Sequence, residues 1–254
     1  MKINSIDKGR AFDFGKTAAF YAAYRDIYPQ ELYDRLRALG VGAGGTAWLD
    51  LGTGTGVLPK NLYNANTDIT GVDISAEQIA FANREADESG RNINYFVSPA
   101  ESTGLPDNSF DVITAAQCFW YFGRDKMQSE IKRMLRPGGK FVKIFMNWDF
   151  EDKIAAESIS LVKQFNPGWN SGRNADADMY DDIFPGRQTE SFYADIPFDR
   201  ESWHGRMTAC RGTLASMDAE TFESWDKAHR EFLGTCPETF KVRHIVYISH
   251  FTME

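Results

Sequence analysis

The sequence contains few of the residues that build disulfide frameworks or metal centres. It has three cysteines and four histidines among 254 residues. The cysteines, Cys118, Cys210 and Cys236, are odd in number, lie far apart and form no C-x-x-C pair, so neither a disulfide framework nor a zinc ribbon is predicted. The histidines are scattered without metal-ligand spacing. We therefore expect no metal site, and a soluble protein of a reducing compartment, the cytoplasm.

The chain also lacks an excess of basic residues and a long apolar segment. Lys and Arg together number 28 against 36 for Asp and Glu, which gives a net charge of −8. This balance argues against a broad nucleic-acid surface. No apolar run approaches the roughly 20 residues of a membrane span, and the first ten residues show no apolar signal core. We expect neither nucleic acid nor membrane as a partner. The sequence does not indicate an oligomeric state.

The chain does have the length and composition of a globular domain. With 254 residues, of which 43% are hydrophobic, it suits one large domain or one domain with an inserted cap. Strand-like runs alternate with helical patterns, which is typical of an α/β fold. The expected strands lie near residues 48–51, 68–72, 93–97, 111–115, 141–145, 190–196 and 242–251. A turn is expected at 135–140, around Pro137-Gly138-Gly139, and a helix is expected near 200–217.

One stretch organises the rest of the chain, residues 48–56, with the sequence W-L-D-L-G-T-G-T-G. An apolar run of strand length ends in three glycines spaced two apart, and a helix-like segment follows. Such a turn lets the backbone bend sharply and lets a ligand approach it, and the helix start favours anionic or polar groups. Val57 occupies the place of the third glycine of a dinucleotide fingerprint. On this motif alone, a glycine turn without a ligand stays open.

An acidic residue follows at a suggestive distance. Asp73 ends the second predicted strand, 21 residues after Gly52, close to the offset of about 20 residues at which an acid meets a ribose diol. The alternative is a helix-cap acid, but Ser75 already begins a capping-box pattern there. We therefore predict that Asp73 binds ribose.

The glycine stretch resembles motif I of the class I S-adenosylmethionine-dependent methyltransferases, hydrophobic-D-x-G-x-G-x-G. Residues 99–111, which include Pro99-Ala100-Glu101 and Leu105-Pro106, are similar to the family's A-E-x-L-P-x-x-x-F-D stretch. The resemblance implies a Rossmann-like, doubly wound sheet of seven mostly parallel strands and S-adenosylmethionine as cofactor. The cofactor-binding residues that it implies are Tyr21, Arg25, Asp50, Gly52, Thr53, Gly54, Gly56, Asp73, Ile74, Ala100, Glu101 and Gln117.

Two of these residues lie before the first strand, in the segment 21–29. Its sequence, Y-A-A-Y-R-D-I-Y-P, is similar to the family's N-terminal Y-x-x-x-R-P-x-Y-P, with Asp26 in place of the first proline. In the family this segment is a helical lid, so the resemblance places Tyr21 and Arg25 near the methionine end of the cofactor. The alternative is that the aromatic residues are packing and Arg25 is a surface charge. An arginine suits a carboxylate because its guanidinium binds both oxygens.

The candidate acceptor site follows the fourth predicted strand. Residues 116–122, A-Q-C-F-W-Y-F, resemble the family's A-Q-A-F-H-W-F, but Trp120 stands where the pattern has histidine. The stretch also departs from the [DN]-P-P-[YF] of enzymes that methylate base amines. We predict Trp120, Tyr121 and, on weaker grounds, His204 as substrate-pocket residues. No catalytic base is assigned.

The sequence is interpreted as a single domain over 1–254. Its predicted parts are an N-terminal lid (1–40), a cofactor core (46–147), a variable cap between strands five and six (149–187), and C-terminal strands and helices (188–254). The predicted reaction is methyl transfer to a small molecule by in-line displacement. A non-catalytic S-adenosylmethionine-binding or regulatory module and, more remotely, a nicotinamide-dependent oxidoreductase are the alternatives. An acidic cluster at Asp176, Asp178, Asp181 and Asp182 fits a solvated loop better than a cation site.

Overall fold

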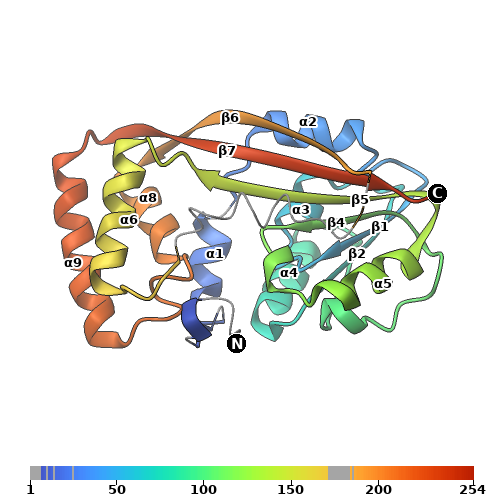
Figure 1. Cartoon of the computed structure of the whole chain (residues 1–254), viewed down its shortest axis with the longest axis horizontal. Coiled ribbons are helices and arrows are strands. Elements are labelled where there is room, and N and C mark those ends of the chain that lie inside the picture. The colour runs from blue at the N-terminus through green and yellow to red at the C-terminus, as the bar shows by residue number, and fades with distance from the viewer. Residues whose placement is uncertain (1–6, 10, 14, 25, 171–183, 185) are drawn as a thin grey trace. The chain divides into compact units, whose positions relative to one another are not determined.

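The structure is a computed structural model that describes residues 7–9, 11–13, 15–24, 26–170, 184 and 186–254 (Figure 1). Its strands are β1 (Ala47–Leu51), β2 (Asp68–Asp73), β3 (Asn94–Val97), β4 (Phe110–Ala116), β5 (Leu135–Trp148), β6 (Gln188–Asp199) and β7 (Thr239–Thr252). Its α-helices are α1 (Ala18–Tyr24), α2 (Gln30–Ala38), α3 (Val57–Asn61), α4 (Ala76–Glu88), α5 (Arg124–Met134), α6 (Lys153–Phe165), α8 (Arg200–Thr208) and α9 (Ala219–Thr235). Short 3₁₀ turns include η1 (Asp7–Gly9), η2 (Gly15–Thr17), η3 (Ala100–Ser102) and η4 (Phe119–Tyr121).

The seven strands form one sheet in the order β3-β2-β1-β4-β5-β7-β6. The pairs β2–β3, β1–β2, β1–β4 and β4–β5 are parallel. β7 runs against β5, because hydrogen bonds join Gly138 to Met253 and Asp149 to Arg243, in opposite chain order. This confirms the predicted α/β class and the predicted sheet of seven mostly parallel strands.

The parallel part of the sheet is buried because helices cover both faces, as the apolar sequence of its strands requires. All five residues of β1 are buried. The core around Leu49, Leu51 and Ile113 is fully enclosed. Helix α5 adds its buried residues Met127 and Ile131 at helical spacing. This rigid layer fixes the positions at which the strands end.

The fifth strand is longer than predicted. The sequence suggested a turn at 135–140 before a strand at 141–145, but β5 begins at Leu135. Phe110 pairs with Leu135 and Val112 pairs with Lys140, so the register shifts across the intervening residues. Gly138 has φ +77° and its N–H donates to the carbonyl of Met253. The predicted turn is therefore a bulge within a paired strand.

The chain divides into two compact units. One consists of residues 28–146, 177–192 and 246–254, and contains β1 to β4; the other consists of residues 1–27, 147–176 and 193–245. We call them the core unit and the helical unit. The bounds of the predicted cap, 149–187, differ from those of both units: the boundary at residue 176 falls inside it. The helical unit also contains α8 and α9, which lie outside the predicted cap. The helix predicted near 200–217 ends at Thr208.

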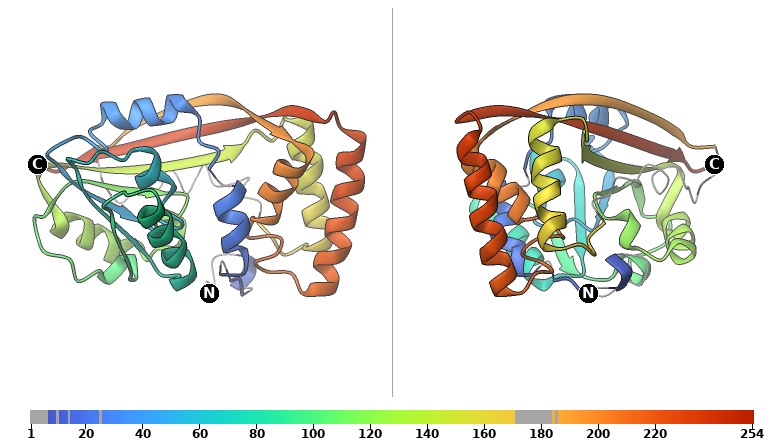
Figure 2. Two further views of the ribbon diagram at one scale, coloured as in Figure 1. Left: turned by 180° about the vertical axis from the view of Figure 1, so that it is seen from behind. Right: turned by 60° about the vertical axis from the view of Figure 1, so that its left-hand side comes forward.

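Within the helical unit, α1 packs on α8, and α9 packs on both α6 and α8 (Figures 1 and 2). Gly205 of α8 makes room for the ring of Tyr24, since a Cβ at this glycine would lie 2.7 Å from Cγ of that ring. Near the N-terminus, Arg211 Nε donates to Asp7 Oδ2 at 2.6 Å. These contacts anchor the N-terminal segment to the C-terminal helices. In the part of the chain that the structure describes, no helix has the length and apolar character needed to cross a membrane.

Candidate active site

The glycine loop joins β1 to α3 at the carboxyl edge of the parallel strands. Gly52, Gly54 and Gly56 all have left-handed backbones, with φ of +63°, +59° and +78°. A Cβ at Gly52 would lie 2.7 Å from Sγ of Cys118. Glycine adopts such angles without steric cost. The left-handed backbone at all three positions and the close approach of Cys118 to Gly52 explain why the loop has glycines there.

Asp73 lies at the same edge, because β1 and β2 are parallel and Leu51 pairs with Val72. Its Oδ2 accepts from the N–H of Gly54 and its Oδ1 from the N–H of Ser75, each at 2.9 Å. Burial raises the pKa of this carboxyl, and the backbone N–H groups oppose the rise. The acid predicted to bind ribose thus also holds the glycine loop in place.

Asp50 lies below this edge, inside the sheet. Only 2% of its surface is exposed, and Thr114 Oγ1 donates to its Oδ1 at 2.5 Å. Trp48 Nε1 in turn donates to Thr114 Oγ1 at 2.9 Å. Burial raises the pKa of Asp50 to about 7, against the hydrogen bond from Thr114. Asp50, like the buried Thr53, supports the loop from beneath, so its carboxylate does not face the open edge.

The next two strands end in exposed apolar residues. Ile74 is 58% exposed and Val97 is 51% exposed, and Val97 pairs with Asp73, the residue before Ile74. Ala100 of η3, three residues after Val97, is buried. The next residue, Glu101, accepts a hydrogen bond at its Oε1 from the N–H of Gly123 at 2.8 Å. Two large exposed apolar residues side by side suit a flat apolar group.

Gln117 follows β4 with an unusual backbone. Its φ is +59°, which a residue with a side chain rarely adopts. Its N–H donates to the carbonyl of Ile144 at 3.0 Å and its Nε2 to that of Met146 at 2.5 Å. These two bonds to β5 hold the strained residue in place. No sequence signal predicted this conformation.

Aromatic side chains gather directly after Gln117. The half-buried ring of Trp120 lies edge-on to Phe145, with centroids 5.1 Å apart, and 5.3 Å from the ring of Tyr121. Phe145 stacks in turn on Tyr247 at 6.3 Å. We call these four residues the aromatic wall. Phe145 and Tyr247 come from β5 and β7 and were not predicted, because only the folded sheet brings them next to the β4 end.

Comparisons with known proteins point to methyltransferases. A family model described as a methyltransferase domain matches residues 49–143. An uncharacterized methyltransferase of Mycobacterium tuberculosis is 29% identical over 166 residues, which are 65% of this chain and 61% of that protein. The chain is also 28% identical over 150 residues to the ubiquinone biosynthesis O-methyltransferase of Actinobacillus pleuropneumoniae, covering 54% of this chain and 64% of that protein.

The solved structure of the Bacillus subtilis protein YcgJ shares the fold. It superposes with a TM-score of 0.54 at 21% identity and covers 85% of this chain and 96% of its own. Residues 49–143 are a class I methyltransferase domain. The chain spans about three-fifths of the length of the mycobacterial relative.

S-adenosylmethionine is the cofactor of this class of methyltransferase and therefore of this domain. The residues of the core unit fit it. The glycine loop leaves a cradle without side chains, Asp73 offers a carboxylate beside that loop, and Ile74 and Val97 offer apolar surface. These residues would hold the sugar and base of the cofactor.

For three of the predicted site residues the described structure gives no position relative to this edge. Arg25 and the side chain of Tyr21 lie outside the described residues. His204 belongs to the helical unit and is 1% exposed. Its two ring nitrogens both contact protein groups, so its imidazole is enclosed by protein rather than presented to a substrate. The acidic cluster at 176–182 also lies outside the described residues, and the described part of the chain holds no group of three or more potential metal ligands.

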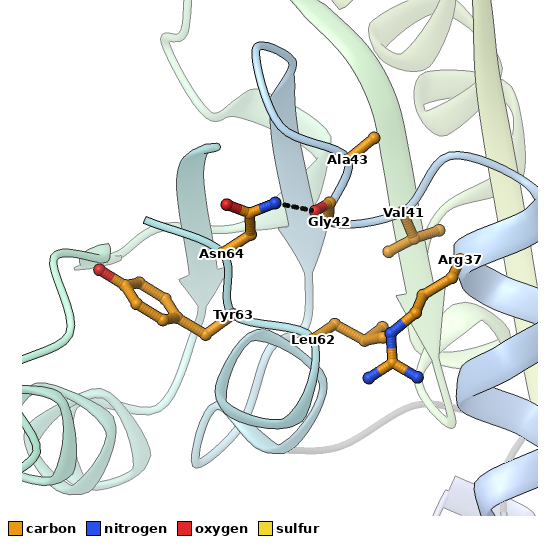
Figure 3. Close-up of a pocket in the computed structure, with 7 residues that line it drawn as sticks. All are labelled: Arg37, Val41, Gly42, Ala43, Leu62, Tyr63 and Asn64. Atoms are coloured by element: carbon orange, nitrogen blue, oxygen red, sulfur yellow. Dashed lines mark hydrogen bonds between the residues drawn. The ribbon is translucent and has the colours of Figure 1, made fainter. Parts of the chain in front are cut away.

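A separate pocket of about 430 Å³ lies at the opposite edge of the methyltransferase core (Figure 3). Its residues precede β1 and β2, and so mark the amino ends of the strands. Asn64 Nδ2 donates to the carbonyl of Gly42 at 3.3 Å, and Arg37 pairs with Asp34 at 3.1 Å. Tyr63 Oη accepts from the N–H of Asn92. Because these polar groups serve the fold, we assign no ligand to this pocket.

Proposed function

We propose that this chain transfers a methyl group from S-adenosylmethionine to a small-molecule acceptor. The observation that carries the proposal is the bond of 2.9 Å between the Asp73 carboxylate and the Gly54 N–H. It joins an acid suited to a ribose diol to a loop suited to a close ligand, at the edge of an open α/β sheet where ligands bind.

The side chains of this unit would bind and orient the cofactor. Asp73 would accept hydrogen bonds from the ribose hydroxyls, and Ile74 and Val97 would offer apolar surface to the base. When bound, S-adenosylmethionine supplies an electrophilic methyl group on a sulfonium, with a neutral leaving group. The protein need mainly place the acceptor atom in line with that methyl group and exclude water. We assign no general base.

The aromatic wall supports a flat, apolar acceptor. Trp120 and Tyr121 are half-buried and follow directly on Gln117, at the end of a central strand. Aromatic faces bind flat apolar groups through large contact areas. The relative from Actinobacillus pleuropneumoniae is named for an O-methyl transfer in ubiquinone biosynthesis, which also favours a small-molecule acceptor for this chain.

The proposal includes a cytoplasmic setting and no nucleic-acid partner. The three cysteines are free thiols, as a reducing compartment maintains them. The net charge of −8 repels phosphate backbones.

A binding screen followed by a transfer assay tests the proposal. Calorimetry with S-adenosylmethionine, S-adenosylhomocysteine and NADPH should show binding of the first two only. Radiolabelled S-adenosylmethionine should then label a member of a panel of phenols, amines and thiols. Binding of NADPH alone would overturn the cofactor assignment. Cofactor binding without transfer to any acceptor would favour a non-catalytic module.

A further inference from the structure

A continuous chain of hydrogen bonds runs through the interior of the helical unit. Asp226 Oδ1 lies 2.7 Å from His204 Nε2, and His204 Nδ1 lies 2.8 Å from His229 Nδ1. His229 Nε2 lies 3.0 Å from Ser158 Oγ, which also accepts from Trp203 Nε1 at 2.9 Å. The chain joins α8, α9 and α6. Both histidines, Ser158 and Trp203 are at most 1% exposed.

The position of every proton in this chain follows from its two ends. A carboxylate can only accept, so His204 donates from Nε2 and accepts at Nδ1. His229 must then donate from its Nδ1 and accept at its Nε2. The hydroxyl of Ser158 donates to that Nε2 and accepts from the indole of Trp203. Burial favours the neutral form of both histidines, and with both rings neutral they hold opposite tautomers, with one proton between the two Nδ1 atoms.

The charged groups around the pair lie on the same helices and at one end of the chain. Asp226 also accepts from Arg230 Nε at 3.2 Å, and Arg230 pairs with Glu201 at 2.9 Å. From α6 only Ser158 faces the pair, since the ionisable residues of this helix, Lys153, Glu157 and Lys163, are all exposed. The helix α1, which packs on α8, has no acidic or basic residue.

The side chain of Asp226 is 32% exposed, so protons reach this end of the chain from solvent. On the other side, the ring of Trp225 stacks on both imidazoles, with centroids 5.3 Å from His204 and 5.1 Å from His229.

A second proton cannot enter this arrangement without breaking a hydrogen bond. If both Nδ1 atoms were protonated, two N–H groups would face each other at 2.8 Å. The other route moves the proton of His229 to its Nε2, and Ser158 then accepts from both the imidazole and the indole. In that state the hydroxyl hydrogen of Ser158 must leave His229 Nε2 and turn to another acceptor. Either route also places a charge in a buried site.

We propose that His204 and His229 form an acid-sensitive latch, which ties α8 to α9 and α6 through one shared proton and releases them when a second proton enters. Release also frees α1, because Tyr24 packs on Gly205 of α8. The latch is thus a device of the helical unit that leaves the glycine loop and the parallel strands unchanged. It does not depend on the proposed methyl transfer.

The sign of the pH dependence follows from the direction of the pKa shifts. Burial lowers the pKa of His204, and burial, with the neighbouring His204 as a second cause, lowers the pKa of His229 to about 3. The open form, with an ordinary pKa near 6.5, binds more protons than the closed one below that pH. The latch is therefore closed above about pH 6.5 and weakens as the pH falls, by up to tenfold in the opening equilibrium per pH unit for each histidine.

Nitrogen-15 NMR of the full chain, labelled at histidine, tests the proton positions directly. At pH 7.5 we expect the Nε2–H tautomer for His204 and the Nδ1–H tautomer for His229. Between pH 7.5 and 5.5 neither ring should titrate in the closed form. The proposal is overturned if either ring titrates near 6.5 without opening of the helices, or if both rings show the same tautomer.

Hydrogen exchange, corrected for the intrinsic effect of pH, tests the release. In the wild-type chain, amides of α8 and α9 should open more as the pH falls from 6 to 5, by up to about 100-fold, while those of β1 and β4 should not. His229→Asn keeps a donor near the Nδ1 position but cannot titrate, so its slope should fall to about tenfold per unit. His250→Asn removes a histidine of the core unit and should keep the wild-type slope. Equal slopes in the wild type and His229→Asn would overturn the proposal, and so would an equal loss of slope in His250→Asn.

Discussion

Asp73 has one observed role and one proposed role. Its carboxylate accepts from the N–H of Gly54 in the glycine loop, and we propose that it also binds the ribose of the cofactor. Removing that carboxylate by Asp73→Ala should weaken S-adenosylmethionine binding by about 1.5–3 kcal/mol, the range of hydrogen bonds to a charged group. Asp73→Asn, which retains one acceptor oxygen, should lose less. Calorimetry measures both. Asp68→Ala, at the exposed opposite end of the same strand, is the matched control. Equal affinity in the wild type and Asp73→Ala would remove Asp73 from the site.

Asp50 makes stability depend on pH in the sense opposite to most acids. Its pKa is raised by burial from 3.8 to about 7, so the folded state retains a proton that the unfolded state has already lost. This contribution is fully favourable below pH 3.8 and is lost as the pH rises through 7. Between pH 5 and pH 8 it should lower the free energy of unfolding by about 2–3 kcal/mol.

Asp50→Asn should remove this dependence, because an amide keeps the acceptor for Thr114 and does not ionise. Urea unfolding at pH 5 and pH 8 measures it, and the variant should gain on the wild type at the higher pH. Parallel curves for the two proteins would contradict the assigned pKa.

Asp73 and Asp50 show what a sequence can predict at the scale of a residue. The spacing of Asp73 from the glycines is a local property of the chain, and the structure places it at the loop. The burial of Asp50 depends on Thr114, which lies 64 positions away. The positive φ of Gln117 depends on carbonyls of β5. Because both the burial of Asp50 and the φ of Gln117 depend on distant residues, no local sequence pattern predicts them.

At the scale of the element, two glycine variants distinguish the conformational cost of a side chain in the glycine loop from its effect on ligand binding. Gly54→Val should abolish cofactor binding, because a branched side chain resists a φ of +59° and fills the cradle. Gly90→Val is the matched control: its φ is +65°, and no atom lies within 4 Å of the position of its Cβ.

Both variants should lose stability, by about 1–2 kcal/mol for the left-handed backbone. Only Gly54→Val should lose affinity. Thermal unfolding with and without S-adenosylmethionine measures both quantities. A cofactor-induced shift of the folded Gly54→Val variant that matches the wild type would place the pocket elsewhere.

The elements themselves follow from periodicity where packing is regular and depart from it where distant segments pair. The strands at 68–72 and 111–115 were predicted to within a residue of β2 and β4, because buried parallel strands read as apolar runs. The turn at 135–140 is instead a bulge paired with Met253. The helix expected near 200–217 ends early, where Thr213 Oγ1 lies 2.8 Å from the carbonyl oxygens of both Met207 and Thr208 and donates to one of them.

At the scale of the whole molecule, the helical unit was the part that the sequence could not define. It joins three stretches of chain, 1–27, 147–176 and 193–245, and its cohesion depends on long-range pairs such as Asp7 with Arg211. No composition shift marks these boundaries. The methyltransferase core, by contrast, is nearly continuous, which is why its motifs were readable in order.

The net charge of −8 is a property of the whole molecule and predicts its behaviour toward nucleic acids. Fluorescence anisotropy with a labelled DNA duplex and a single-stranded RNA should show no binding at 150 mM salt. Lowering the salt to 50 mM should not bring out tight binding, since few phosphates are neutralised. A steep salt-dependent affinity for either probe would defeat the small-molecule proposal.

The N-terminal segment has a structural contact and a predicted function. Helix α1 packs on α8 within the helical unit, and residues 21–29, which begin in α1, resemble a cofactor lid. If Arg25 binds the carboxylate of the cofactor with both prongs of its guanidinium, Arg25→Ala should raise the dissociation constant of S-adenosylmethionine about 10- to 100-fold. Arg25→Lys should recover only part of that loss, since an ammonium makes a single point contact. Lys16→Ala removes an exposed positive charge from the same segment and should leave affinity unchanged. All three variants should melt within about 2 °C of the wild type. An Arg25→Ala chain with unaltered affinity and turnover would show that the segment is packing alone, in spite of its resemblance to a lid.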